Sequence, residues 1–431
     1  MKQIRTKGRG AQQAVEVLAA LEQRGGAALD SVLPAVKRIV ADVRKRGDRA
    51  LLRYAAEFDG LAGEADLRVT PQEMAAAWEA IPLAMQQALS TAANQIRAFA
   101  VRQLPESWAG SPDSPDEPVD GLTTGQLVRP LGAVGCYVPS GRHPLPSTLL
   151  MTVIPAQVAG VERIAVVSPK PAPETLAAAH LLGITEFYRL GGAHAIAALA
   201  YGTASLPRVD KIVGPGNLYV TAAKRLVAFD CAIDMLAGPT EIVVTSERGD
   251  VAAIASDLVA QAEHDPEALA IFITTRADLA KEVVAETKLR SHNNPVALQA
   301  LDRNGLVIIA SNVDEARAIT NRLAPEHLTV DAAKDLEWVQ NAGSVFVGRW
   351  SSQPMGDYIS GPNHTLPTGG MARVRGGLSV NDFVKLITVQ EYSLQALRTL
   401  GPQAALLADA EGLTGHAEAI RIRLQRRKPR A

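Results

Sequence analysis

Apolar residues recur along this chain with two different periods, and the change of period separates two regions. In residues 11–24, 32–45, 48–58 and 71–99, apolar side chains return every three or four positions, which predicts amphipathic helices. Residues 104–120 are rich in proline, serine and acidic side chains without any period, which predicts a loop. The N-terminal region is therefore expected to be helical up to this loop.

From about Leu127 onward, short β-rich runs alternate with helical runs. The predicted strands are residues 163–167, 187–190, 211–213, 241–245, 268–274, 305–310 and 344–347. The predicted helices are residues 174–182, 193–201, 218–227, 250–264, 277–289 and 313–323. This alternation predicts parallel sheet with crossover helices, and it fits two doubly wound α/β units with a seam near residues 237–240. After Gly377 the pattern is helical to the end.

The composition indicates a soluble globular protein and excludes several other classes. The chain has 431 residues, enough for about three domains, and 47% of them are hydrophobic and 21% charged. A net charge of −1 gives no electrostatic reason to expect binding to nucleic acid or to a membrane surface. Two cysteines cannot form a disulfide framework, and neither a signal peptide nor a membrane-spanning run is recognisable. We therefore expect a cytoplasmic protein.

Gln261 and His264 stand at the end of the predicted helix 250–264, just before the helix-stopping pair Asp265-Pro266. Residues three apart lie one turn above each other, so the amide oxygen and the imidazole are expected to point the same way. Two such groups begin a metal site but do not complete it. The alternative is that the histidine simply complements the helix dipole.

Three glycine-rich turns occur in one small region, at residues 132–141, 191–194 and 214–217. Glycine allows backbone N–H groups to approach a phosphate, and a helix N-terminus favours an anion. None of the turns matches the dinucleotide fingerprint, and glycine is common in any strand-to-helix turn. Three together favour a nucleotide site, with Tyr137 available for stacking. Cys136 has no cationic neighbour in sequence, so it is expected to be packed and inert.

Glu326 and His327 are adjacent, follow a predicted helix and lead into a strand-like run, which suits two proton-transfer groups. The alternative is that the glutamate caps a turn and the histidine packs. Residues 355–364 are dense in glycine and polar side chains and are expected to form an irregular site loop, with Asp357 as a possible metal ligand and His364 as a weaker one. His416 near the C-terminus would normally be assigned to solvent.

Together these segments resemble the histidinol dehydrogenase family. The matching stretches are GCYVPSGRHPLPSTLLM, RLGGAHAIAALAYGT, KIVGPGNLYVTAAKR, AGPTEIVV, QAEHDP, APEHL, GDYISGPNHTLPTGG and EGLTGHAEAIRIR. The likeness covers nearly the whole chain from about Lys37 onward, in the order of the family, and the combination is highly specific although each piece alone is not.

The resemblance implies a homodimer with one zinc ion per subunit that oxidises L-histidinol to L-histidine, consuming two NAD+ in turn. The implied zinc ligands are Gln261, His264, Asp357 and His416, and the implied acid–base pair is Glu326 and His327. The implied substrate contacts are Thr240, Gln261, His264, His327, Asp357, Glu411 and His416. The implied NAD contacts are Tyr137, His194 and Asn217. Glu411 and His416 would come from the partner subunit, so the two active sites would be shared.

The resemblance also implies a layout of two incomplete Rossmann-like doubly wound domains, one inserted in the other, with small helical N- and C-terminal segments. Residues 28–131 and 241–378 would form the main domain, and residues 132–240 the inserted NAD-binding domain. Residues 1–27 and 379–431 would be the terminal segments, the latter reaching the partner's active site. The chain departs from the family pattern at three positions, with Ser140 in place of glycine, His194 in place of glutamine and Thr240 in place of serine.

The residue types suit this chemistry. Two imidazoles, a carboxylate and an amide oxygen form a borderline nitrogen–oxygen site fit for Zn2+. Because zinc has no redox role, hydride must leave to NAD+, with His327 taking the alcohol proton and Glu326 activating water for the second oxidation. Two alternatives stay open: a zinc hydrolase, and a sister dehydrogenase for another amino or sulfonated alcohol. A non-catalytic binding module is disfavoured by the intact ligand set.

Overall fold

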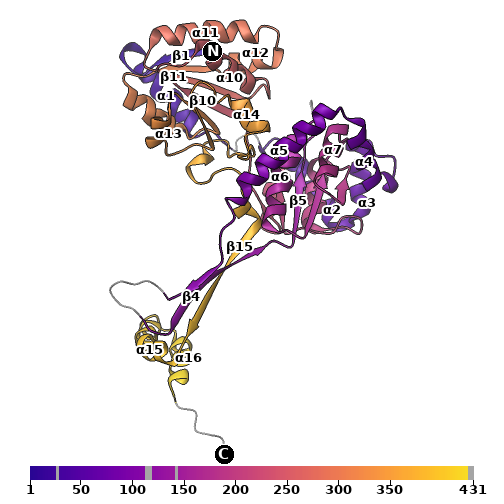
Figure 1. The fold of residues 1–431 in the computed structure, drawn as a ribbon, viewed down its shortest axis with the longest axis vertical. Coiled ribbons are helices and arrows are strands. Elements are labelled where there is room, and N and C mark those ends of the chain that lie inside the picture. Colours follow the sequence, from indigo (N-terminus) through magenta and orange to yellow (C-terminus); the bar gives the residue numbers. More distant parts are fainter. Residues whose placement is uncertain (26–28, 112–118, 141–143, 426–431) are drawn as a thin grey trace, which may run out of the picture. The chain divides into compact units, whose positions relative to one another are not determined.

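The computed structural model describes residues 1–25, 29–111, 119–140 and 144–425 (Figure 1). It divides into two compact units, which are described separately. Unit 1 consists of Met1–Gln103 and Leu131–Phe383, and unit 2 of Leu104–Pro130 and Val384–Ala431. Among the described residues, no helix combines the length and the apolar character needed to cross a bilayer.

The first sheet of unit 1 is fully parallel, in the order β1-β12-β11-β10-β13-β14. Its strands are β1 (Lys2–Arg5), β10 (Glu241–Thr245), β11 (Leu269–Thr274), β12 (Leu306–Ile309), β13 (His327–Val330) and β14 (Ser344–Val347). Its helices are α1 (Ala11–Glu22), α10 (Val251–Ala262), α11 (Ala277–Ser291), α12 (Pro295–Asn304), α13 (Val313–Leu323) and α14 (Gln353–Tyr358). The chain order reverses between β10 and β13, which makes their shared border the topological switch point.

Both faces of this sheet are buried, which explains its continuous apolar strands. Successive side chains of a strand point to opposite faces. Ile242 and Val244 accordingly lie in one hydrophobic cluster with residues of α10, α11 and α12. Val243 lies in a second cluster with residues of α1 and α13.

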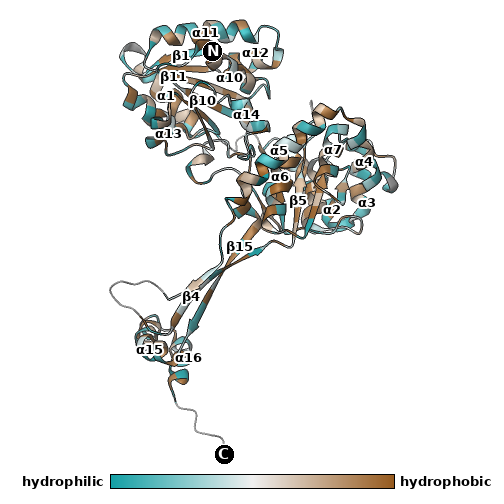
Figure 2. Cartoon of the chain, viewed as in Figure 1, coloured by the Kyte–Doolittle hydropathy of each residue, from teal (hydrophilic) through white to brown (hydrophobic). Residues whose placement is uncertain are grey.

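The second sheet repeats this topology, in the order β2-β7-β6-β5-β8-β9, with only the pair β2–β7 antiparallel. Its strands are β2 (Arg68–Val69), β5 (Ala133–Tyr137), β6 (Arg163–Val167), β7 (Glu186–Tyr188), β8 (Lys211–Val213) and β9 (Ala232–Ile233). Its helices are α2 (Leu33–Arg46), α3 (Asp48–Tyr54), α4 (Pro71–Ala80), α5 (Leu83–Val101), α6 (Pro146–Ala159), α7 (Pro173–Leu181), α8 (Gly192–Tyr201) and α9 (Leu218–Val227). Helix α6 is buried over most of its length, and its apolar colouring in Figure 2 reflects this.

The two sheets confirm the predicted α/β class with two Rossmann-like units. The grouping of residues 28–131 with the first sheet differs from the packing. Leu29, Val36 and Leu51 belong to a hydrophobic cluster that contains Ala165 and Val167 of the second sheet. An amphipathic pattern shows that a helix has a face to bury, but it does not show which sheet receives that face. The remaining domain boundaries stay a prediction.

Unit 2 contains an antiparallel sheet of β3 (Trp108–Gly110), β4 (Leu122–Pro130) and β15 (Val384–Tyr392), and the helices α15 (Leu394–Ala410) and α16 (Thr414–Leu424). The expectation of helix from Gly377 onward was wrong for β15, whose Val, Ile, Thr and Tyr residues favour strand. The predicted loop 104–120 contains β3, and its residues 112–118 lie outside the described ones. The predicted irregular loop 355–364 begins inside helix α14.

Candidate functional site

The amino ends of β10 and β13 bring Thr240 and Glu326 together. Each residue directly precedes its strand, and the two strands are parallel neighbours with Ile242 opposite His327. Helix α10 returns from the carboxyl end of β10, so its last turn delivers Gln261 to the same edge. The crossover connection thus explains why residues distant in sequence meet at one edge.

A chain of hydrogen bonds joins these three side chains. Gln261 Nε2 donates to Thr240 Oγ1, and Thr240 Oγ1 donates to Glu326 Oε2 at 2.6 Å. The backbone N–H of Glu241 donates to the same carboxylate oxygen at 2.7 Å. Because a carboxylate only accepts, this chain fixes the orientation of the Gln261 amide and leaves its Oε1 buried without a partner among the described groups. A buried amide oxygen of this kind is suited to a cation.

His327 lies beside this chain and is almost fully buried. Its Nδ1 donates to the backbone carbonyl of Glu241 at 3.1 Å, and its Nε2 lies 3.7 Å from Asp357 Oδ1. Burial lowers the pKa of His327, but the carboxylates of Glu326 and Asp357 outweigh burial and raise the pKa to about 10. The neighbouring carboxylates therefore stabilise positive charge on this imidazole.

Asp357 is held by two neighbours. Gln353, one turn earlier on α14, donates through Nε2 to Asp357 Oδ2 at 2.8 Å, and His364 Nδ1 donates to the Asp357 carbonyl at 2.8 Å. Burial raises the pKa of Asp357, but the imidazoles of His327, His364 and His264 outweigh this and lower it. Burial lowers the pKa of His364 itself. The Asp357 carboxylate is therefore kept ionised.

His264 lies two residues beyond the end of α10, and its charge contributes to the lowered pKa of Asp357. Helix α10 ends at Ala262, two residues before the end of the predicted helix 250–264. His264 is exposed, unlike Gln261. A cavity of about 380 Å³ opens beside these groups and is lined by His327 and Asp357.

The structure brings together Thr240, Gln261, Glu326, His327 and Asp357. The predicted residues Glu411 and His416 lie in unit 2, where both are exposed. Across the described parts of the chain, no three His, Cys, Asp or Glu side chains form a group that would hold a metal. The predicted ligand set would not form such a group within one chain, because it includes an amide and takes its fourth member, His416, from the partner subunit.

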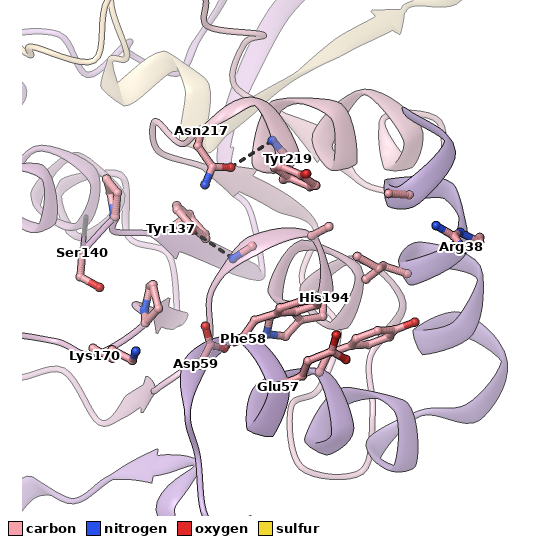
Figure 3. A pocket seen from close by; sticks show the side chains of 17 residues that line it. Arg38, Glu57, Phe58, Asp59, Tyr137, Ser140, Lys170, His194, Asn217 and Tyr219 are labelled. Carbon is pink, nitrogen blue, oxygen red and sulfur yellow. Dashed lines mark hydrogen bonds and ion pairs between the residues drawn. The ribbon is translucent and has the colours of Figure 1, made fainter. Parts of the chain in front are cut away.

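A second site lies at the carboxyl ends of β5 and β8, the switch point of the second sheet. A cavity of about 840 Å³ opens there and is lined by all three predicted NAD contacts, Tyr137, His194 and Asn217 (Figure 3). Asn217 Oδ1 caps α9 by accepting from the N–H groups of Tyr219 and Val220 at 3.0 and 3.2 Å.

Two turns of this cavity are held close to Tyr137. Gly214 has a φ of +111°, and a Cβ there would lie 2.1 Å from the Tyr137 carbonyl oxygen, so only glycine fits. Gly192 N donates to the Tyr137 hydroxyl at 3.2 Å, and burial raises the pKa of that hydroxyl to about 12. The neighbouring Cys136 is fully buried, and burial raises its pKa to about 12, in agreement with an inert thiol.

Sequence reasoning missed three residues at the two sites. Asp59 accepts from His194 Nε2 at 2.7 Å, and Lys170 lines the same cavity with a φ of +47°. No sequence signal marks either residue. Gln353 could have been found, because it precedes Asp357 by four positions, the spacing of one helical turn.

Comparison with known proteins gives a consistent result. A family model described as Histidinol dehydrogenase matches residues 22–424. The chain is 47% identical over 404 residues to the Histidinol dehydrogenase of Geobacillus kaustophilus, covering 91% of this chain and 94% of that protein. It is 44% identical over 405 residues to that of Bacillus thuringiensis subsp. konkukian, covering 91% and 93%.

A solved structure also matches. The fold superimposes on the crystal structure of Histidinol Dehydrogenase from Elizabethkingia anophelis with a TM-score of 0.90 and 33% identity, and the match covers 98% of both chains. The likeness therefore extends over the whole fold rather than over one domain.

Proposed function

Because the chain belongs to the histidinol dehydrogenase family, we propose that it oxidises L-histidinol to L-histidine through the aldehyde, with one zinc ion per subunit and two NAD+ per turnover. The observation that carries the zinc proposal is Gln261 Oε1. Its Nε2 is committed to Thr240, and the oxygen is buried without a partner among the described groups. The donor set fits the group, because amide oxygen, imidazole and carboxylate are ligands that Zn2+ accepts.

The residues that would hold the metal are Gln261, His264 and Asp357, with His416 of the partner subunit as the fourth. When bound, zinc supplies a Lewis acid that fixes the imidazole and amine of the substrate. Gln353 keeps Asp357 Oδ2 occupied at 2.8 Å, and Oδ1 is the oxygen that lies 3.7 Å from His327 Nε2. A cation bound to Asp357 would also weaken the electrostatic attraction between the Asp357 carboxylate and the protonated His327 imidazole. The pKa of His327 would then move back toward its ordinary value.

His327 would act as the base for the alcohol proton. Its Nδ1–H is committed to the Glu241 carbonyl, so the proton is gained and lost at Nε2, the atom that faces Asp357. Glu326 would activate water for the second oxidation, with its Oε2 oriented by Thr240 and the Glu241 N–H. The remaining substrate contacts would be Thr240 and, from the partner subunit, Glu411 and His416.

The hydride acceptor would bind in the second-sheet cavity, against Tyr137, His194 and Asn217. NAD+ supplies the two-electron acceptor that zinc lacks. The position supports this assignment, because ligands of open α/β sheets bind outside the carboxyl ends of strands at the switch point. The cavity volume of about 840 Å³ is ample for a dinucleotide.

A homodimer with shared active sites is part of the proposal. Glu411 and His416 are exposed on unit 2, at the end of α15 and in the first turn of α16. An exposed pair of this kind is available to a second copy of the chain. A cytoplasmic location, a small-molecule substrate and no role in binding nucleic acid or membranes complete the proposal.

The test follows NADH absorbance with the purified, zinc-loaded chain. L-Histidinol should yield two NADH per histidine, and other amino or sulfonated alcohols should be oxidised far more slowly. Glu326→Gln should spare alcohol oxidation but slow aldehyde oxidation by at least about 100-fold, the usual size of a general-base effect. The exposed Glu337→Gln is the matched control and should leave both steps unchanged. Equal loss of both half-reactions in Glu326→Gln would contradict the assigned role.

A further inference from the structure

One carboxylate in the second-sheet cavity has no role in the function described so far. Asp59 ends a single turn of π-helix, Ala55–Asp59, that continues α3, and the chain then reverses at Gly60 with a φ of +73°. Single π-turns are rare in proteins, and those that occur are often found at functional sites. Asp59 is 8% exposed, and the described residues give it no lysine or arginine partner.

One oxygen of Asp59 accepts two hydrogen bonds from other elements that form the cavity. Asp59 Oδ2 accepts from the Gly191 N–H at 3.0 Å and from His194 Nε2 at 2.7 Å. Nε2 therefore carries the proton, and Nδ1 is turned toward Gly192, where an added Cβ would lie 3.6 Å away. The ring of His194 also lies 6.1 Å from the ring of Tyr54 and 6.0 Å from that of Phe58, centroid to centroid. The hydrogen bond to Asp59 and the two ring contacts hold the imidazole; Asp59, Phe58 and His194 are labelled in Figure 3.

The same carboxylate fixes the beginning of α8. Gly191 and Gly192 form this turn, with Gly191 N bound by Asp59 and Gly192 N bound by the Tyr137 hydroxyl. A glycine pair has no side chain to stabilise its own conformation. The turn that carries His194 is thus held by two side chains from other elements, and Asp59 contacts both the turn and the ring.

We propose that Asp59 is a positioning residue for dinucleotide binding, which acts by holding His194 and the Gly191–Gly192 turn. The inference rests on the proposed function, because it takes NAD+ as the ligand of this cavity. A bare negative charge in the cavity would weaken binding of the anionic pyrophosphate. If Asp59 acted only through its charge, removing it would tighten NAD+ binding. The positioning role predicts instead that removing Asp59 weakens NAD+ binding.

The test is titration of NAD+ into the zinc-loaded protein by calorimetry, together with steady-state kinetics. Asp59→Leu should raise the dissociation constant and the KM for NAD+ at least tenfold, because leucine is of similar size but cannot accept a hydrogen bond from Gly191 or His194. The kcat at saturating NAD+ should stay within about threefold. Glu57→Gln removes a charge from the wall of the same cavity without touching His194, and it should leave NAD+ binding equal or slightly tighter. The exposed Asp66→Asn should bind as the unmodified protein does.

Two variants of His194 keep the proposal testable if Asp59→Leu does not fold. His194→Gln retains a donor for Asp59 and should bind NAD+ within about threefold of the unmodified protein. His194→Leu removes the donor and should also raise the dissociation constant for NAD+. In a double-mutant cycle, Asp59→Leu should weaken binding less in the His194→Leu background than in the unmodified protein, because only the contact with the Gly191 N–H is then left to remove.

The outcomes separate this inference from the proposed function. If the unmodified protein binds NAD+ and either folded Asp59→Leu or folded His194→Leu binds it equally well, Asp59 positions nothing and the inference is wrong. If the unmodified protein neither binds NAD+ nor forms NADH from L-histidinol, the proposed function itself fails.

Discussion

The two sheets of unit 1 share one topology, but their switch points are filled differently. In the first sheet, the turn after β10 is closed by Asp331, which accepts from the N–H groups of Glu247 and Arg248 at 2.8 and 3.2 Å and from Ser246 Oγ. A cavity of about 610 Å³ lies there, but its turn amides are already used. In the second sheet, the corresponding turn carries Ser140, whose Oγ is buried without a partner among the described groups.

This difference shows that the same topology places a cavity at each switch point, and that different side chains line the two cavities. Backbone N–H groups bind a phosphate only while no internal acceptor satisfies them. In the first sheet, an aspartate satisfies them, and the candidate chemistry lies instead at the amino ends of β10 and β13. In the second sheet, Asp59, the Tyr137 hydroxyl and Asn217 also accept from turn N–H groups, but the cavity at the carboxyl ends stays open. Four predictions test the difference between the two sheets.

The largest expected effect comes from removing the metal. Dialysis against a chelator should lower turnover at least about 100-fold, because loss of a metal removes several kcal/mol of transition-state stabilisation. NAD+ affinity, measured by calorimetry, should change less than twofold, because none of the proposed ligands lines the second-sheet cavity. Re-addition of Zn2+ should restore turnover. A parallel loss of NAD+ binding would show that the two sites are not separable.

Removing the Asp331 carboxylate from the turn after β10 should destabilise the fold without creating a nucleotide site in the first sheet. Asp331→Ala leaves Ser246 Oγ and the N–H groups of Glu247 and Arg248 without their acceptor, which should cost about 2–3 kcal/mol of unfolding free energy. Urea denaturation measures this loss, with the exposed Asp314→Ala as control. Binding of a second NAD+ per chain by Asp331→Ala would mean that Asp331 alone closes the first site.

Asp257 is a buried carboxyl group that lines the first-sheet cavity, and its ionisation should affect the free energy of unfolding. Burial raises its pKa from 3.8 to about 6, so the folded state disfavours the ionised form. A raised carboxyl pKa means that stability is lost as pH rises from about 4 to 6. Asp257→Asn should therefore gain on the order of 2–3 kcal/mol of unfolding free energy relative to the unmodified protein between pH 4 and pH 7. Urea unfolding at both pH values measures the difference, and the exposed Asp302→Asn should show none.

The smallest effect concerns backbone strain, which occurs once at each site. Ala324, just before Pro325 and Glu326, has a φ of +47°, as does Lys170 in the second-sheet cavity. Ala324→Gly should raise the free energy of unfolding by about 0.5–1 kcal/mol, because glycine adopts this conformation without the penalty of a Cβ. Ala285→Gly, at an exposed position inside α11, should instead lower it by about 1 kcal/mol. If both variants are destabilised, Ala324 is not strained.

Much of the fold was predictable because burial on both faces of a parallel sheet leaves a visible pattern. The strands at 241–245, 344–347 and 163–167 were predicted with the bounds that the structure gives them. Strand β15 was not, because its apolar and polar residues do not alternate regularly, as Leu386 and Ile387 show, and most of its side chains are exposed. The sheet on which α2 and α3 pack was also beyond pattern reasoning, since either sheet offered an apolar face.

The chain by itself determined which chemistry is present: Gln261, Glu326, His327 and Asp357 were recognisable from local spacing and resemblance. Only the tertiary structure decided which of their atoms are free, because hydrogen bonds between distant segments assign each donor. Gln261 Nε2 is committed to Thr240 while its Oε1 is not, and His194 is committed to Asp59, 135 residues earlier. Local patterns encode faces and turns, whereas the pairing of buried polar atoms depends on how strands and crossover helices meet.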